Sequence, residues 1–112
     1  MDANALRALQ APLKERYKQD PNAALVTFAA RATLDGERVA CQVETRSGPV
    51  VAGLHPAAGG TGEDACSADM LLQALVACAG VTLKAVATAM EIPLRAGEQK
   101  TIKYQYKVFV RE

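Results

Sequence analysis

Residues 64–94 read DACSADMLLQALVACAGVTLKAVATAMEIPL, and this stretch decides the fold because it is long, helical in pattern and almost wholly apolar. Ser67 is a suitable N-cap, since its hydroxyl can accept a hydrogen bond from the unpaired amides of a first helical turn. Asp69 adds a negative charge beside the positive end of the helix dipole. Pro93 marks the expected end. The pattern predicts one helix of about two dozen residues, roughly 35 Å long.

A helix that is apolar around most of its circumference has to be covered by a membrane, a large core or another subunit. The uninterrupted apolar stretch, residues 70–82, is shorter than the ~20 residues that a bilayer span needs, which argues against a membrane. A chain of 112 residues builds only a modest core. We therefore expect a homodimer, in which the small residues Ala74, Ala77, Ala79 and Gly80 would let the two helix backbones approach closely.

Composition excludes several classes of function. Lysine and arginine number 13 and aspartate and glutamate 12, so the net charge of +1 gives no electrostatic case for binding nucleic acid. The first twenty residues lack a basic start followed by an apolar run, so they are not a secretory signal, and a cytoplasmic location is expected. Cys41, Cys66 and Cys78 are odd in number and lack metal-ligand spacing. We expect free thiols, no metal and no other cofactor.

The first twenty residues are predicted to form a helical segment that precedes the main domain, residues 21–112. Leu6, Leu9, Leu13 and Tyr17 recur at helical spacing. Pro12 is expected to kink this helix or to divide it.

Strands are predicted on both sides of the long helix. Residues 24–33 alternate in polarity, Asp35-Gly36 supplies a tight turn, and Val39, Cys41 and Val43 share one face of a second strand. Residues 50–54 return as a third strand, and a glycine-rich loop, residues 55–62, leads to the helix. Residues 102–111 alternate again after it. The predicted fold is α+β: an antiparallel β-meander and a long central apolar helix, completed by dimerisation.

The run GLHPAAGGTGEDACSADMLLQALVACAGVTLKAVATAMEIPL, residues 53–94, resembles the centre of the OsmC/Ohr family. Members of that family have an apolar helix of the form ELLLAALAACxxMTL with a reactive cysteine at the position of Cys78. The resemblance extends over residues 24–96 in the order of elements. It implies an α+β homodimer with a thiol site at the subunit boundary. It also implies a peroxidase that reduces organic hydroperoxides in oxidative-stress defence: a thiolate attacks the O–O bond, becomes a sulfenic acid and is resolved by a second cysteine.

The chain departs from the family pattern at three places. The family's resolving cysteine lies on a second long helix, and this chain ends at Glu112 before such a helix, so it resembles a C-terminally short member. The family's glutamate ten residues before the reactive cysteine is replaced by Ala68. The activating arginine normally comes from the N-terminal hairpin, where Leu34 occupies the closest register. Three arginines remain candidates for that role: Arg31, Arg38 and Arg46.

The predicted site consists of Cys78 as the attacking thiol, Arg38 as the activating arginine and Cys66 as a candidate resolving thiol. Each thiol also has a structural interpretation: Cys78 can be an inert small hydrophobe inside a helix, and Cys66 a simple loop residue before one. Cys41 is expected in the sheet core. His55 could act as a base or simply be an exposed loop residue.

Three functions stay open on the sequence alone. The first is a thiol peroxidase acting on a small lipophilic hydroperoxide with a thiol reductant. The second is a non-catalytic dimer that binds a small lipophilic molecule at its apolar interface. The third is a truncated family member without activity.

Overall fold

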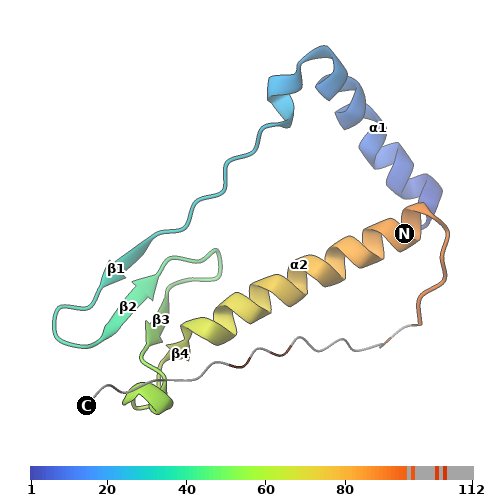
Figure 1. Ribbon diagram of the computed structural model, residues 1–112. Coiled ribbons are helices and arrows are strands. Elements are labelled where there is room, and N and C mark those ends of the chain that lie inside the picture. The colour runs from blue at the N-terminus through green and yellow to red at the C-terminus, as the bar shows by residue number, and fades with distance from the viewer. Residues whose placement is uncertain (96, 98–102, 104, 106–112) are drawn as a thin grey trace. The chain divides into compact units, whose positions relative to one another are not determined.

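The computed structural model describes residues 1–95, 97, 103 and 105. It has an α+β architecture with a four-stranded sheet and two α-helices, α1 (Ala3–Gln19) and α2 (Ser67–Ala89), as Figure 1 shows. The strand predicted at residues 102–111 falls almost wholly outside the described residues. By its contacts the described chain forms two compact units, one of Met1–Phe28 with residues 77–95 and one of Ala29–Val76.

The sheet in the second unit has the strand order β1-β2-β3-β4. Strands β1 (Ala32–Leu34), β2 (Ala40–Val43) and β3 (Val50–Gly53) run antiparallel to their neighbours, so the predicted meander is confirmed. Sequence reasoning missed β4 (Ala65–Cys66), which pairs parallel with β3 and is followed directly by α2. Because β4 has only two residues, it leaves no alternating pattern to recognise.

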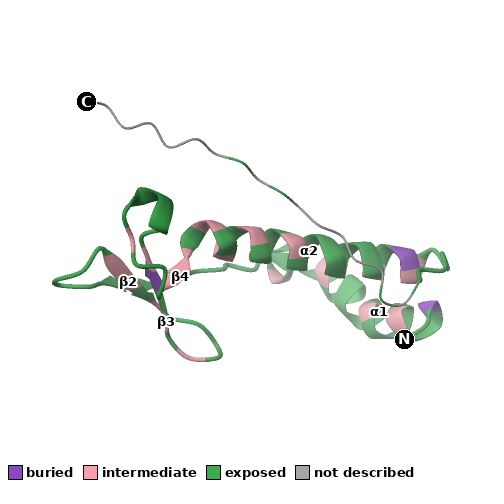
Figure 2. Ribbon diagram, turned by 90° about the horizontal axis from the view of Figure 1, so that it is seen from below, coloured by how far each residue is buried: buried purple, intermediate pink, exposed green. Residues whose placement is uncertain are grey.

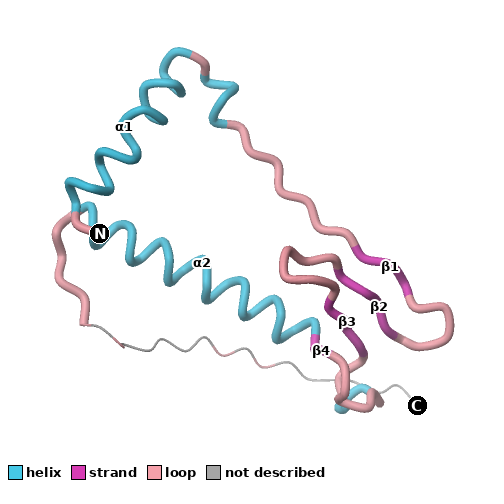
Figure 3. Tube along the Cα trace, turned by 180° about the vertical axis from the view of Figure 1, so that it is seen from behind, coloured by secondary structure: helices cyan, strands magenta, loops and turns pink. Residues whose placement is uncertain are grey.

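The first strand is much shorter than predicted. The expected strand over residues 24–33 contributes only Ala32–Leu34, and the chain from residue 25 to 31 is a loop in Figure 3. Its partner β2 ends at Val43, and a turn closed by the Gly48 amide on the Thr45 carbonyl at 3.1 Å follows. Beyond the Glu44 amide, which donates to the Arg31 carbonyl, residues 25–30 face no partner strand within the described chain. A segment whose residues alternate in polarity does not form a β-strand unless a neighbouring strand pairs with it.

The turn at Asp35-Gly36 lies where it was predicted but is longer. Residues 35–39 connect β1 to β2, with the Asp35 amide donating to the Ala40 carbonyl at 3.0 Å. The Asp35 carboxylate accepts the backbone N–H groups of Glu37 and Arg38, each at 2.9 Å. An aspartate that accepts amides from the next residues of its own loop stabilises a wider turn than the two-residue type expected.

Helix α1 is continuous through Pro12, so of the two expected outcomes, a kink or a division, the division is wrong. The Asp2 carboxylate caps its start by accepting the Ala5 amide at 2.8 Å. A third-turn proline removes one intrahelical hydrogen bond, and the remaining bonds of the 17-residue helix keep it in one piece. Two short 3-10 turns, η1 (Pro21–Ala24) and η2 (Pro56–Ala58), complete the elements.

Helix α2 begins at Ser67 and ends at Ala89, before the proline that was expected to stop it. Its end is a Schellman motif: the Ile92 amide donates to the Ala87 carbonyl at 2.8 Å and the Glu91 amide to the Thr88 carbonyl at 3.2 Å. Glu91 adopts a left-handed φ of 58°. The motif is unusual because a glutamate occupies the position where glycine is preferred.

Very little of the described chain is buried, as the scarce purple in Figure 2 shows. Ala3, Ala52 and Ala87 are its buried apolar residues, and Cys41, expected in the sheet core, is half-buried. Helix α2 is long and apolar enough to cross a membrane by length and composition. The expectation that this segment is too short for a bilayer span is therefore wrong. A mostly buried core helix of a soluble protein passes the same test, so this property alone does not assign α2 to a membrane.

Candidate functional site

Cys78 lies on α2 within the first unit and is exposed. It is some three helical turns from Ser67, where the positive end of the helix dipole has no effect on a thiol. At 100° per residue, Leu71, Leu75 and Thr82 share its side of the helix. Leu71 and Leu75 are 71% and 51% exposed, so the predicted reactive thiol stands on an open apolar face.

An apolar pocket of about 420 Å³ lies in the same unit, between the start of α1 and the second half of α2. Its lining residues are Met1, Leu6, Gly80, Val81, Lys84, Ala85 and Thr88. Val81 and Ala85 follow Cys78 by three and seven positions, which places them on nearly the same side of α2. The pocket therefore begins about one turn, roughly 5 Å, along the helix from Cys78.

One hydrogen bond joins α1 to the end of α2 beside this pocket. The Arg7 guanidinium donates to the Ala89 carbonyl at 3.1 Å. That carbonyl is one of the four unpaired acceptors at a helix C-terminus, and a cation there also complements the helix dipole. Ala3 on α1 and Ala87 on α2 are each 4% exposed, so the small side chains are the ones excluded from water here.

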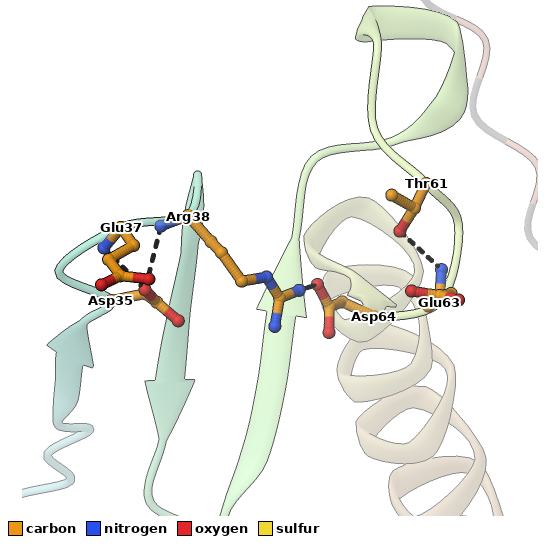
Figure 4. Close-up of polar contacts among 6 residues, drawn as sticks. All are labelled: Asp35, Glu37, Arg38, Thr61, Glu63 and Asp64. Atoms are coloured by element: carbon orange, nitrogen blue, oxygen red, sulfur yellow. Dashed lines mark hydrogen bonds and ion pairs between the residues drawn. The ribbon is translucent and has the colours of Figure 1, made fainter.

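Arg38 lies in the second unit and forms an ion pair with Asp64, shown in Figure 4. The 35–39 loop positions it, because the Asp35 carboxylate accepts the Arg38 amide. The Arg38 side chain is 52% exposed and the Asp64 side chain 18% exposed. Sequence reasoning placed Arg38 among three candidates and missed Asp64 as its partner. Their separation along the chain follows no motif, and only the sheet brings the two loops together.

The Arg38–Asp64 pair borders a second pocket of about 250 Å³, formed with the glycine-rich loop. Its other lining residues are Val39, Leu54, Gly59, Gly60 and Thr61. Gly60 is required in this loop, because a Cβ atom there would collide with the Leu54 carbonyl oxygen. Gly53 is required for a similar reason, since a Cβ atom there would lie 2.6 Å from the Asp64 Oδ2 atom.

Cys66 and Cys41 lie on the sheet but on opposite faces. Cys66 on β4 pairs with Gly53, and Gly53 pairs with Ala40, whereas Cys41 pairs with Ala52. Paired residues point to the same face and successive residues to opposite faces, so the two thiols point apart with β3 between them. Both are half-buried free cysteines. Cys66 belongs to a strand, not to the loop proposed for it, and directly precedes α2.

His55 has a structural role in the glycine-rich loop. Its Nδ1 atom accepts the Ala57 amide at 3.0 Å and so caps the start of η2. This contact favours a structural role for His55 over a role as a base, because Nδ1, the nitrogen that could accept a proton, already accepts the hydrogen bond of the Ala57 amide.

The loop amides perturb the Asp35 carboxyl. The backbone N–H groups of Glu37 and then of Arg38 lower the pKa of the Asp35 carboxyl, since both donate to its charged form. Desolvation opposes this lowering of the pKa, and the nearby Arg38 charge makes the smallest contribution, which adds to the lowering. Within residues 1–95, 97, 103 and 105, no group of three histidine, cysteine or acidic side chains could hold a metal ion.

The predicted site residues thus belong to two units: Cys78 to the first, Arg38 and Cys66 to the second. No family model, no curated protein and no solved structure matches the chain.

Proposed function

We propose that the chain is a thiol-dependent peroxidase of the OsmC type, which reduces lipophilic organic hydroperoxides in oxidative-stress defence. The main support is that Cys78 is exposed and stands about one turn from an apolar pocket in the same unit. A lipophilic hydroperoxide held by Leu6 and Val81 would have its polar end free to meet the thiol. The resemblance of residues 53–94 to the OsmC/Ohr family supports the type of reaction, the attack of a cysteine thiolate on a hydroperoxide.

In the proposed reaction the Cys78 thiolate attacks one oxygen of the hydroperoxide. A sulfur–oxygen bond forms, the O–O bond breaks, and the departing alkoxide takes up a proton to become an alcohol. An external thiol then displaces water from the sulfenic acid and forms a mixed disulfide with Cys78. A second external thiol releases the Cys78 thiol and leaves as part of a small disulfide.

We assign the family's activating arginine to Arg38. Its guanidinium is half exposed and its loop is held by Asp35. A fixed cation favours a thiolate over a thiol. The family's glutamate is replaced by Ala68 here, and we propose that Asp64 positions the arginine instead.

The proposal includes a cytoplasmic homodimer that buries the exposed face of α2. On that face, Leu71, Leu75 and Val86 are between 49% and 71% exposed in one chain. Apolar patches of this kind are typical of interaction surfaces. Cys78 shares this side of α2, so the thiol would lie at the subunit boundary, as the resemblance implies.

Peroxide consumption by the purified chain tests the activity. We expect turnover of cumene hydroperoxide with dithiothreitol, loss of turnover in Cys78→Ser, and unchanged turnover in Cys41→Ser, whose thiol lies on β2. Arg38→Ala is expected to slow the first oxidation step about 10²-fold, the scale on which fixed catalytic charges act. Brief peroxide treatment followed by sulfenic-acid trapping should label Cys78 first. Predominant labelling of Cys41, or equal activity in Cys78→Ser, would contradict the proposal.

A second candidate is a non-catalytic dimer that binds a small lipophilic molecule. The pocket of about 420 Å³ favours it, because this volume is within the range of small-molecule sites and its walls are mainly apolar. The reaction of Cys78 with peroxide distinguishes the two candidates. If the chain binds lipophilic molecules and Cys78 is not oxidised by peroxide, the non-catalytic function is the correct one.

A further inference from the structure

The apolar pocket between α1 and α2 has a polar side that neither candidate function uses. Lys84 and Thr88 both line it, and they are one helical turn apart on the same face of α2. The other lining residues are apolar or glycine. One wall therefore consists of the two residues that carry an ammonium group and a hydroxyl, and the remaining walls consist of aliphatic residues and glycine.

Lys84 is exposed and makes no ion pair within the described residues, whose two ion pairs are Lys18–Glu15 and Arg38–Asp64. Asp69, the acidic residue of α2, lies fifteen positions earlier, about four turns along the helix. The charge of Lys84 thus has no carboxylate of its own element nearby.

From this arrangement we infer that the pocket binds an alkyl chain that ends in a carboxylate. The chain lies against Leu6, Val81 and Ala85, and the carboxylate meets the Lys84 ammonium and the Thr88 hydroxyl. A charged donor and a neutral donor together match the two oxygens of one carboxylate. The inference rests on the second candidate function, that this unit holds a lipophilic molecule, and is independent of the reactivity of Cys78.

Decanoate and 1-decanol are suitable probes because they share an alkyl chain and differ in charge. We expect isothermal titration at pH 8 to show that the protein binds decanoate more tightly than 1-decanol. Lys84→Met keeps the aliphatic stem and removes the charge, so it should weaken decanoate binding roughly three- to tenfold and leave 1-decanol within about twofold. Lys84→Arg should retain the preference.

Two further variants locate the site. Lys14→Met removes an exposed charge of α1 outside the pocket and should change neither affinity. Gly80→Leu places a larger side chain in the pocket and should abolish binding of both probes; a Cβ atom at position 80 meets no atom within 4 Å. Circular dichroism of each variant verifies the helices.

The inference is overturned if decanoate does not bind, if Lys84→Met weakens both probes equally, or if Gly80→Leu leaves binding intact. No peroxide is present in these titrations, and Cys78→Ser should bind decanoate like the unmodified chain. A failure here therefore leaves the peroxidase assay untouched, and an inactive Cys78 leaves this inference standing.

Discussion

At the scale of single residues, the 35–39 loop depends on one carboxylate. The Asp35 carboxylate accepts hydrogen bonds from two backbone N–H groups, and one of these bonds fixes the backbone of Arg38. The sequence predicted a turn at this aspartate from the Asp-Gly pair, but the identity of the amides that it accepts was set by the loop geometry.

The lowered pKa of Asp35 has a definite consequence for stability. A carboxyl whose pKa is depressed by folding contributes stability above its unfolded pKa of about 3.9, and this contribution is lost as the pH falls through the folded value. We expect the urea midpoint of the protein to fall between pH 5 and pH 3, and that of Asp35→Asn to fall less. A carbon-13 titration of the Asp35 carboxyl should place its pKa below 3.8. Equal acid sensitivity of the two proteins would contradict this role.

The separation of the thiols predicts how an oxidised Cys78 is resolved. Cys66 directly precedes α2 and Cys78 lies within it, so along one continuous helix their Cα atoms are roughly 18 Å apart. A disulfide requires less than about 7 Å. We expect turnover to depend on an external thiol and Cys66→Ser to retain most of it. An intersubunit Cys66–Cys78 disulfide on a non-reducing gel, together with loss of turnover in Cys66→Ser, would show the opposite.

At the scale of elements, the pattern in the sequence was sufficient where an element is long or paired over its whole length. Helix α2, helix α1 and the meander were all recognisable, because apolar periodicity and turn residues agree there. Strand β4 and the shortened β1 were not, since the limits of a strand depend on the length of its partner. The Arg38–Asp64 contact could not be predicted from the sequence for a similar reason. It joins two loops, and the pairing of the strands determines how close these loops lie.

The end of α2 offers a test of local strain. Glu91 adopts the left-handed conformation, which costs roughly 1–2 kcal/mol for a residue with a side chain. Glycine avoids this cost, but its unfolded state has more conformational freedom, which offsets part of the gain in stability. We expect Glu91→Gly to raise the free energy of unfolding by about 0.5–1 kcal/mol in urea titrations. Met90→Gly, one residue earlier and without a positive φ, is the matched control and should lower it. The interpretation fails if both glycines act in the same direction.

At the scale of the whole molecule, the described chain leaves most of its large apolar side chains exposed. Its buried apolar side chains are alanines, which contribute little transfer free energy against the entropy cost of ordering the chain. Among the residues that the structure describes, eighteen large apolar ones are exposed, and Leu71, Leu75 and Val86 of α2 are among them. Composition predicted the excess of apolar helix surface. Which side of α2 remains open could not be known without the position of α1.

We expect an obligate homodimer in which this open face of α2 is the contact, and not the expected seam of small residues, because Gly80 of that seam lines the pocket with Leu6 of the same chain. Leu75→Asp places a charge in the face and should shift sedimentation at micromolar concentration towards smaller or unfolded species. Lys84→Ala, on a different side of the helix, should leave the assembly unchanged. A well-folded monomer at that concentration, or equal behaviour of the two variants, would show that the face is not an interface.

The glycine-rich loop has a consequence for which sequences this fold can accept. At Gly60 the carbonyl of Leu54 occupies the space of a side chain, whereas at Gly36 nothing lies within 4 Å of that position. In a library that substitutes every amino acid at both sites, selected for soluble expression, position 36 should accept most replacements and position 60 almost none. The sequence alone does not distinguish the two glycines. The fold requires glycine at position 60, and it leaves position 36 open to substitution.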